Sequence, residues 1–299
     1  MRLVTFRSDG GRRLGVLRPG QDDEVIELAE PTSMLALIES GDEGLARVQD
    51  TLSSPSNSRI RKITDIKLLP PVTPRGNVVA VGRNYAKHAA ETSKVWDAPS
   101  PPTIFTKAIT SLTEPYADIT IDPNLSDKID WEVELAVVIG KRGANIKQAD
   151  AAEYVFGYTV LNDVTARDIQ NEWGGQWFKG KSLDRTCPTG PWIVTRDEVP
   201  NPGALDVRLR VNGELKQEGN TADMIYSVEA IIEWASKGMT LLPGTIIATG
   251  TPDGVGFART PPEYLKPGDV METEVEGIGL LRNRFVSAVG HPVPAGAIP

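Results

Sequence analysis

Two glutamates lie two residues apart in the apolar stretch DKIDWEVELAVVIG, residues 127–140. Successive side chains of a strand point to opposite faces, so Glu132 and Glu134 would share one face of a strand, with Cα atoms about 6.5–7 Å apart. Two carboxylates in an apolar setting are costly unless a cation, a basic partner or water compensates their charge. Taken alone, the spacing also fits an exposed strand edge with a solvated polar face.

A third carboxylate, Asp163, comes just after the apolar run YVFGYTVL, residues 154–161. By itself it fits a turn residue or a helix cap. Beside the two glutamates it would complete a set of oxygen ligands that suits Mg²⁺, for which Mn²⁺ is a close substitute. Zinc usually recruits more nitrogen and sulfur, and the chain offers one cysteine, Cys187. The three carboxylates therefore favour the hypothesis of a hard divalent cation.

The chain contains two histidines, His88 and His291. His291 lies in a tail rich in Pro and Gly, residues 290–299, so His88 is the candidate for chemistry. Glu91 follows His88 at a spacing of one helical turn, at which the two side chains can meet. An ordinary surface pair or a packed histidine fits this spacing. A functional alternative is a carboxylate that orients an imidazole and makes it a general base near neutral pH.

Composition limits the classes of function. The 299 residues carry a net charge of −8, the pI is near 5.0, and no run of Lys and Arg occurs, so no nucleic-acid partner is expected. One cysteine excludes an intrachain disulfide. The sequence lacks an apolar run of the about 18 residues that a membrane span needs, and its N-terminus is unlike a secretory signal. We therefore expect a soluble cytoplasmic protein without a membrane partner.

The elements that would position these residues are mostly strands. Residues 1–30 predict three short strands, followed by a short helix around 33–40 and a connection over 50–77. We place a domain boundary here, with a small N-terminal domain over 1–70 and a catalytic domain over 71–299. Asn212-Gly213 between alternating runs predicts a hairpin. Because few helices alternate with the strands, an antiparallel or mixed β architecture is favoured over a parallel doubly wound sheet.

Two loops carry further candidate residues. GTPDGVG, residues 250–256, has glycines that permit tight turns and close approach to a ligand, but it lacks the Lys-Ser/Thr end of a phosphate loop. FKGKSLDRTCPTGPW, residues 178–192, contains Lys179, Lys181 and Arg185. It fits either a solvated loop or an anion-binding patch for an acidic substrate.

Five segments together resemble the fumarylacetoacetate hydrolase family: VGRNYAKHAAE, DWEVELAVVIGK, GYTVLNDVTARDIQ, GKSLDRTCPTGPW and TGTPDGVG. They extend over roughly residues 75–285, and their joint order is specific although no single segment is decisive. The resemblance implies an α+β, mostly β fold, in which a mixed β-roll forms the C-terminal domain and a small α/β domain precedes it. It also implies a homodimer.

The resemblance further assigns roles to residues. It implies that Glu132, Glu134 and Asp163 bind Mg²⁺ or Mn²⁺, that His88 and Glu91 form a catalytic dyad ordered by closure of a lid, and that Lys181 is the active-site lysine. The positions that line the substrate pocket of the family correspond to Arg83, Tyr85 and Thr251. Trp96, in the segment 91–101, fits equally a lid aromatic or a packing residue.

The chemistry that this set implies starts with a small acidic 2-oxo acid bound to the metal. Our first expectation is hydrolysis of a C–C bond in an acylpyruvate-type β-diketo acid, through an enolate that the metal stabilises. The same electron sink would serve an isomerase or decarboxylase of 2-hydroxymuconate-like or oxaloacetate-like acids. A third alternative is a metal-binding homodimer without activity, which the complete set of candidate residues disfavours.

Overall fold

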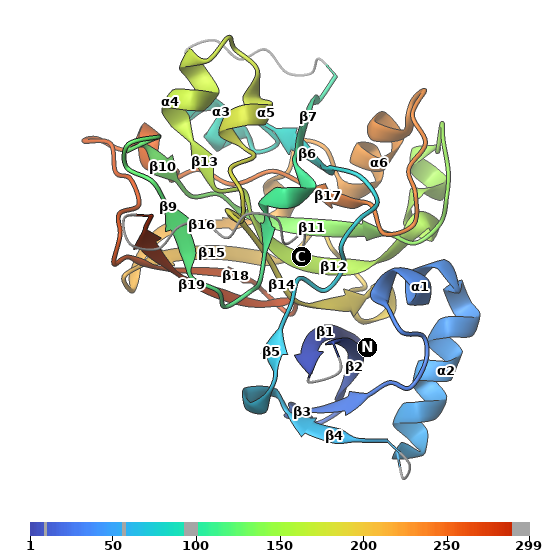
Figure 1. The fold of residues 1–299 in the computed structure, drawn as a ribbon. Coiled ribbons are helices and arrows are strands. Elements are labelled where there is room, and N and C mark those ends of the chain that lie inside the picture. The colour runs from blue at the N-terminus through green and yellow to red at the C-terminus, as the bar shows by residue number, and fades with distance from the viewer. Residues whose placement is uncertain (9–10, 56–57, 93–100, 289–299) are drawn as a thin grey trace.

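The computed structural model describes residues 1–8, 11–55, 58–92 and 101–288 (Figure 1). Trp96 and His291 lie outside these residues. The N-terminal part consists of β1 (Arg2–Ser8), β2 (Gly11–Arg18), β3 (Gln21–Glu27), α1 (Met34–Glu39), α2 (Gly41–Ser53), β4 (Ile60–Lys62), η2 (Ile63–Asp65) and β5 (Lys67–Leu68). The three predicted strands and the first helix are confirmed. The connection predicted over 50–77 is in part wrong, because α2 continues to Ser53 and both β4 and β5 pair with the sheet.

A twelve-stranded sheet forms the centre of the molecule, in the order β4-β3-β2-β1-β14-β12-β11-β17-β6-β7, with β5 beside β1 and β8 beside β14. Its later strands are β6 (Val78–Gly82), β7 (Thr103–Lys107), β8 (Leu112–Thr113), β11 (Val133–Ile139), β12 (Val155–Asn162), β14 (Cys187–Thr195) and β17 (Ile246–Ala248). Most neighbours are antiparallel, whereas β17 with β6 and β14 with β8 are parallel. The predicted mixed sheet is therefore confirmed.

A second sheet of five strands has the order β16-β15-β18-β19-β9, and β10 pairs with β13 in a short ladder. These strands are β9 (Ile119–Ile121), β10 (Ile129–Asp130), β13 (Thr165–Ala166), β15 (Asp206–Val211), β16 (Glu214–Asn220), β18 (Val270–Val275) and β19 (Gly279–Ser287). The predicted hairpin is confirmed as β15–β16. Asn212 and Gly213 at its turn have φ of 53° and 81°, the positive values that a type I′ turn requires.

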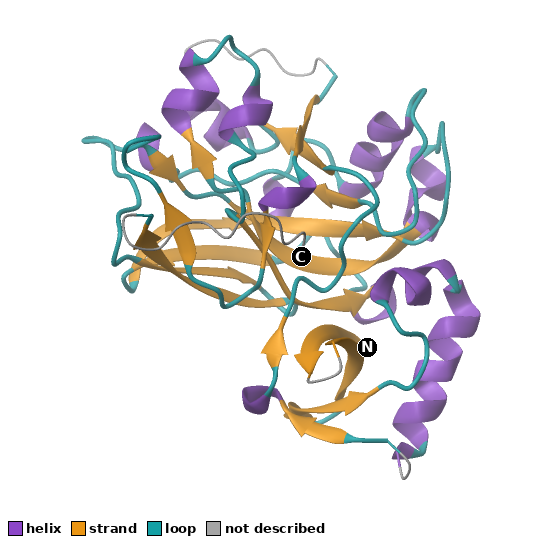
Figure 2. Ribbon diagram, in the orientation of Figure 1, coloured by secondary structure: helices purple, strands orange, loops and turns teal. Residues whose placement is uncertain are grey.

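Helices occupy the periphery of the sheets, and strands dominate (Figure 2). The α-helices of the larger part are α3 (Ala86–Thr92), α4 (Arg167–Glu172), α5 (Trp177–Gly180) and α6 (Val228–Ser236). The short 3₁₀ helices are η3 (Ile109–Ser111), η4 (Gln148–Tyr154), η5 (Arg196–Glu198), η6 (Thr221–Asp223) and η7 (Gly256–Ala258). Ser227 caps α6 by accepting a hydrogen bond from the Ala230 N–H, as its position before an apolar helix predicts. Among the described residues, no helix has the length and apolar character to cross a membrane.

Strand β11 is buried along its whole length, and its side chains alternate between two hydrophobic clusters. Val133, Leu135 and Val137 join one cluster, while Ala136 and Val138 join the other. Because of this alternation, Glu132 and Glu134 lie on the same face as Ala136 and Val138. The predicted shared face is confirmed, and the burial of both glutamates rules out a solvated strand edge.

The N-terminal part continues the central sheet, because β1 pairs antiparallel with β14. It also has a small hydrophobic cluster that includes Val4, Phe6 and Val25. The division at residue 70 remains a prediction, since strands from both sides of it belong to one sheet.

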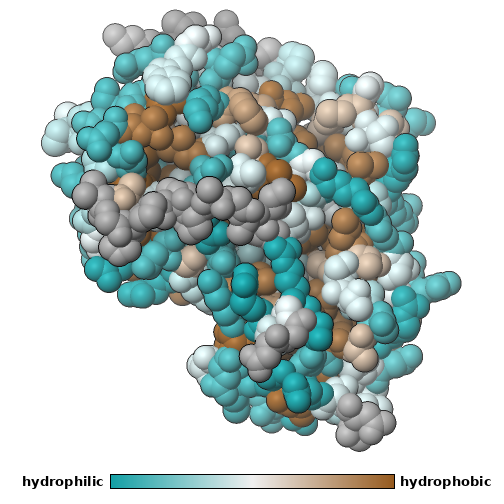
Figure 3. All heavy atoms as spheres, viewed as in Figure 1, coloured by the Kyte–Doolittle hydropathy of each residue, from teal (hydrophilic) through white to brown (hydrophobic). Residues whose placement is uncertain are grey.

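Figure 3 shows the face of the molecule that Figure 1 presents to the viewer; it is mostly hydrophilic, with hydrophobic residues in separate patches.

Glu114 connects the two parts. Its buried side chain lies 3.3 Å from Lys67 of β5, forms an ion pair with Arg185 and accepts a hydrogen bond from Thr113 Oγ1 at 3.0 Å. Burial opposes ionisation of Glu114, but hydrogen bonds from the backbone and Thr113, together with the two cations, outweigh burial and lower its pKa from 4.5 to about 2.

We expect Glu114→Gln to lower the free energy of unfolding at pH 7 by about 1–2 kcal/mol, less than the full pKa shift implies because solvent partly screens the pairs. A carboxyl whose pKa is lowered by folding stabilises the protein above its unfolded pKa and loses this effect as the pH falls toward 2. Urea unfolding at pH 7 and pH 3 measures both values. The difference between variant and wild type should shrink at pH 3; an equal difference at both pH values would contradict the assignment.

Candidate active site

The three predicted metal ligands converge at one end of β11 and β12. Glu132 directly precedes β11, Glu134 lies within it, and Asp163 directly follows β12. The two strands are antiparallel and pair Val133 with Asn162, which places these ends side by side. One carboxylate oxygen from each residue lies within 4.8 Å of the other two. All three side chains are buried, and Asp163 is 0% exposed.

Two buried amides fix the backbone between the glutamates. Asn162 Oδ1 accepts a hydrogen bond from the Glu132 N–H at 3.1 Å, and Gln217 Oε1 accepts one from the Val133 N–H at 3.0 Å. Gln217 Nε2 also donates to Thr251 Oγ1 at 2.9 Å. The second sheet, which contains Gln217, therefore positions both the carboxylates and the 250–256 loop.

Three buried cations surround the carboxylates. Lys181 Nζ lies 2.8 Å from Glu132 Oε2 and 2.9 Å from Asp163 Oδ2. Lys107 Nζ, at the end of β7, lies 2.6 Å from Asp163 Oδ1 and donates to the Lys181 carbonyl oxygen. Arg167 is the first residue of α4, and its Nη2 lies 2.8 Å from Glu132 Oε1. Lys181 is among the site residues predicted from sequence, whereas Lys107 and Arg167 are not.

The two glutamates of the shared face differ in electrostatic environment. Burial alone would raise the pKa of Glu132, but the charges of Lys181 and Arg167 lower it to about 2. Burial and the neighbouring charges of Asp163 and Glu132 hold the pKa of Glu134 well above its usual 4.5. Glu134 accepts a hydrogen bond from the Gly250 N–H at 2.6 Å, but it has no ion pair within the described part of the chain. Its charge is the one that an added cation would compensate.

The donor set fits a hard divalent cation. All three candidate ligands are carboxylates, and Asp163 Oδ2 accepts no hydrogen bond from the described residues although Lys181 lies beside it. Four-coordinate zinc would favour nitrogen or sulfur, whereas carboxylate oxygens suit Mg²⁺ and Mn²⁺. Glu132, Glu134 and Asp163 are therefore the residues that would hold such an ion.

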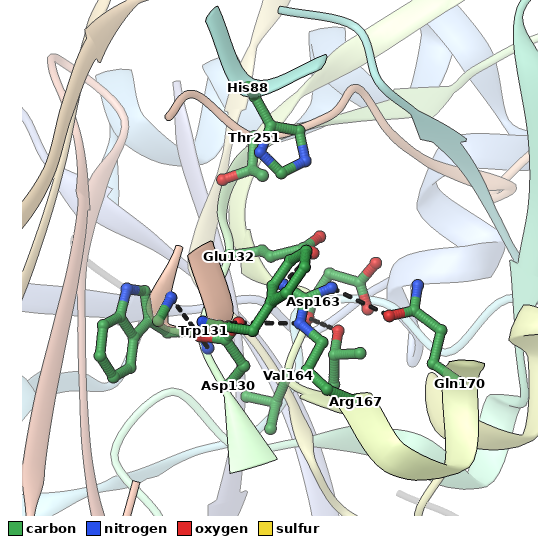
Figure 4. A network of polar contacts seen from close by, with 12 residues as sticks. His88, Asp130, Trp131, Glu132, Asp163, Val164, Arg167, Gln170 and Thr251 are labelled. Atoms are coloured by element: carbon green, nitrogen blue, oxygen red, sulfur yellow. Dashed lines mark hydrogen bonds and ion pairs between the residues drawn. The ribbon is translucent and has the colours of Figure 1, made fainter. Parts of the chain in front are cut away.

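His88 and Glu91 meet as their helical spacing predicts. Both lie on α3, with His88 Nδ1 2.9 Å from Glu91 Oε1. An ionised carboxylate can only accept, so Nδ1 carries the proton and Nε2 is the basic nitrogen. The Glu91 carboxylate also accepts from the Gly254 N–H at 3.0 and 3.2 Å, which ties α3 to the 250–256 loop. In Figure 4 the His88 ring lies across an open space from Glu132 and Asp163.

A cavity of about 280 Å³ occupies this space. Its walls include five of the predicted site residues, namely Arg83, His88, Glu132, Lys181 and Thr251. Arg167, Gln170 and Trp177 complete much of the remaining wall. A larger cavity, of about 590 Å³, is lined by other residues such as Lys216 and Tyr264, and it contains none of the predicted set.

Two predicted pocket residues differ in their placement. Arg83 has a left-handed backbone with φ of 59°, and its guanidinium lies 5.6 Å from the centre of the Trp177 ring at the cavity wall. Tyr85 is not part of that wall: it is 2% exposed, and its backbone bridges to Met224. Its hydroxyl has no hydrogen-bond partner among the described residues. Burial, together with the charges of Glu134 and Asp223, raises the pKa of Tyr85.

Comparison with known proteins agrees with this fold. Residues 77–286 match the fumarylacetoacetate (FAA) hydrolase C-terminal family, and the chain belongs to the fumarylacetoacetate hydrolase family. Its relatives include the mitochondrial oxaloacetate tautomerase FAHD2B of Bos taurus, 44% identical over 294 residues that span 96% of this chain and 92% of the relative. Oxaloacetate tautomerase YisK of Bacillus subtilis (strain 168) is 42% identical over 262 residues, 85% of this chain and 87% of that protein.

A solved structure shows the same architecture. The fumarylacetoacetate hydrolase from psychrophilic Exiguobacterium antarcticum aligns with a TM-score of 0.84 and 39% identity, over 96% of this chain and 99% of that one. The mostly β, α+β fold predicted from sequence is therefore confirmed. The names of these relatives are those of enzymes, of both the tautomerase and the hydrolase kind.

Proposed function

We propose that this protein is a divalent-metal-dependent tautomerase that interconverts the keto and enol forms of oxaloacetate or a closely similar small 2-oxo acid. One observation carries the proposal: a histidine oriented by a carboxylate lines the same cavity as Lys181 and Glu132, and Glu132 belongs to the cluster of three carboxylates. Relatives from an animal and a bacterium that bear the name oxaloacetate tautomerase support the choice of reaction.

Tautomerisation moves one proton between C3 of the substrate and the oxygen on C2, and it consumes no water. In the keto-to-enol direction His88 Nε2 would take the proton from C3 and deliver it to the C2 oxygen, and in the reverse direction it would move the proton from that oxygen back to C3. Glu91 would stabilise the imidazolium that forms between the two transfers. The Lys181 ammonium is placed to hold the negative charge that develops on the C2 oxygen. A bound Mg²⁺ or Mn²⁺ would supply a Lewis acid for the C1 carboxylate and the 2-oxo group.

The cavity also suits the second carboxylate of a dicarboxylic acid. Arg83 and Arg167 both line it, and guanidinium groups bind carboxylates through paired hydrogen bonds. Arg167 is already held by protein carboxylates, whereas Arg83 is exposed and contacts the Trp177 ring. Arg83 is therefore our candidate for the distal carboxylate.

Hydrolysis of a C–C bond in an acylpyruvate is the second candidate. It was the first expectation from sequence, and the dyad of His88 and Glu91 favours it because the same base could activate a water molecule. A structural relative is named a fumarylacetoacetate hydrolase. Decarboxylation of oxaloacetate would need the same metal and lysine but no base.

An assay with enol-oxaloacetate separates these activities. With Mg²⁺ or Mn²⁺ we expect faster loss of the enol absorbance, and malate dehydrogenase should then recover all the substrate as oxaloacetate. Pyruvate and CO₂ would indicate decarboxylation instead, and pyruvate plus an acid from acetylpyruvate or fumarylpyruvate would indicate hydrolysis. An enol decay no faster than that in metal-containing buffer would overturn the tautomerase proposal.

We further propose a homodimer, which light scattering on the purified chain would test against a mass of 32.4 kDa per protomer. We also keep the cytoplasm as the proposed compartment. A relative from Bacillus subtilis is compatible with it, whereas the bovine relative is named as mitochondrial. Fractionation of cells that express the native chain would decide between these compartments.

A further inference from the structure

Asp130, two residues before Glu132, is fully buried at the end of β10 and makes four hydrogen bonds. Its Oδ1 accepts from the N–H groups of Trp131 at 2.8 Å and Gly256 at 2.6 Å. Its Oδ2 accepts from the Phe257 N–H at 3.0 Å and from Arg167 Nε at 2.8 Å. One carboxylate thus holds both a turn of the loop after residue 250 and the arginine beside a candidate metal ligand.

Arg167 has a fixed orientation because of these contacts. Nε bonds to Asp130, Nη1 donates to Gln170 Oε1 at 3.0 Å, and Nη2 lies 2.8 Å from Glu132 Oε1. The Phe257 ring covers the guanidinium at 4.3 Å. Figure 4 shows Arg167 between Asp130 and Gln170, below Glu132.

The loop contact requires a close approach of backbone to carboxylate. A Cβ on Gly256 would lie 2.6 Å from Asp130 Oδ1, so this position demands glycine. Two residues earlier, the Gly254 N–H donates to Glu91 of the dyad, and the Gly254 carbonyl accepts from Trp131 Nε1 at 3.2 Å. The loop that Asp130 holds is therefore the one that anchors the dyad.

Charge balance gives Asp130 a second effect. Arg167 has two carboxylates within ion-pair distance among the described residues, Asp130 and Glu132. Without the charge of Asp130, Glu132 would be the remaining carboxylate partner of the guanidinium among the described residues, and the less compensated positive charge of Arg167 would oppose a cation at that oxygen. Two unit charges about 4 Å apart interact more strongly at a buried site than in water, because the protein interior screens them less.

We propose that Asp130 is a positioning residue that couples the two halves of the active site. Through Arg167 it keeps Glu132 available to the metal. Through the Gly256 and Phe257 amides it holds the loop whose Gly254 N–H is hydrogen-bonded to Glu91 of α3. The effect on Glu132, the metal half of the inference, rests on the proposed metal site. The effect on the loop after residue 250, the loop half, is independent of any metal.

The metal half is tested by a double-variant cycle on Mg²⁺ affinity, measured by calorimetry on the full-length protein and repeated with Mn²⁺. We expect Asp130→Asn to weaken binding about tenfold, as loss of other outer partners of metal ligands does. Combining it with Arg167→Met should restore affinity to within about threefold of wild type, because the competing cation is removed. Arg167→Met alone should bind Mg²⁺ no more weakly than wild type. Asp168→Asn is the matched control, since Asp168 lies on α4 but bonds instead to Ser126 and the Ile169 N–H.

A general loss of structure would give a different pattern, in which Asp130→Asn and the double variant bind Mg²⁺ equally weakly; that result would overturn the metal half of the inference. Should Asp130→Asn not fold, weaker binding by Arg167→Met alone would have the same consequence.

The loop half is tested in the metal-free protein by hydrogen exchange. Asp130→Asn should accelerate exchange in the peptide containing 254–258, and unchanged exchange there would contradict it. If wild type binds neither metal, the metal-site proposal fails and the exchange result still decides the loop half.

Discussion

Glu134→Gln is expected to abolish tight Mg²⁺ binding while leaving the metal-free protein at least as stable as wild type. Glu134 is 2% exposed, lies beside two other carboxylates and has no ion pair among the described residues. Its charge is therefore destabilising until a cation binds. The neutral amide removes this repulsion, and its oxygen can still accept from the Gly250 N–H. We expect a loss of affinity of at least about a hundredfold, the upper end of the effect of outer-shell changes.

Asp163→Asn provides the contrast. Asp163 is the partner of two buried lysines, Lys107 at 2.6 Å and Lys181 at 2.9 Å. Loss of one member of a buried ion pair leaves uncompensated charge and costs about 3–5 kcal/mol. Both variants should lose Mg²⁺ in calorimetric titration, but only Asp163→Asn should lower the unfolding temperature in the presence of a chelator.

Two results would contradict this account. Wild-type Mg²⁺ affinity in Glu134→Gln would remove Glu134 from the ligand set. A destabilisation of the metal-free Glu134→Gln variant as large as that of Asp163→Asn would show that the Glu134 charge is already compensated in the folded protein.

The sequence pattern predicted those parts of the site whose geometry is set by residues close together in the chain. The alternation along β11 sets the shared face of Glu132 and Glu134, and the helical spacing of His88 and Glu91 sets their contact. Spacing could not decide between a buried ligand pair and a solvated strand edge. That decision depended on the resemblance of five segments in order, and the burial of both glutamates agrees with it.

The residues that sequence reasoning missed are those that act across long separations. Lys107 reaches Asp163 from 56 positions away, and Gln217 reaches the Val133 N–H from 84. Neither residue stands in a pattern of its own: Lys107 ends a strand, and Gln217 lies within a polar hairpin. Arg167 and Asp130 were within the recognised segments, but their hydrogen bond depends on the pairing of β10 with β13, which brings Asp130 beside Thr165. Tyr85 was a pocket candidate because of the family resemblance; the structure buries its side chain, which does not line the cavity that contains His88.

His88→Ala is expected to lower turnover of enol-oxaloacetate by about 10²–10⁴, the usual effect of losing a general base, while Mg²⁺ affinity stays within about threefold of wild type. The metal should remain because Glu132, Glu134 and Asp163 are held by β11, β12 and the three buried cations rather than by α3. Tautomerisation and hydrolysis both need this base, so the loss is expected whichever substrate is turned over.

Glu91→Gln separates orientation from charge in the same dyad. Glutamine can still accept from the Gly254 N–H, which keeps α3 attached to the loop, but it cannot stabilise the imidazolium as a carboxylate does. We therefore expect a loss of activity of about tenfold, smaller than for His88→Ala. Lys87→Ala, at an exposed position of the same helix, is the matched control and should keep wild-type turnover.

If His88→Ala keeps more than about a tenth of the activity, the proton is moved by another group. In that case Lys181 becomes the residue to vary, because it lines the cavity and its ammonium lies beside both Glu132 and Asp163.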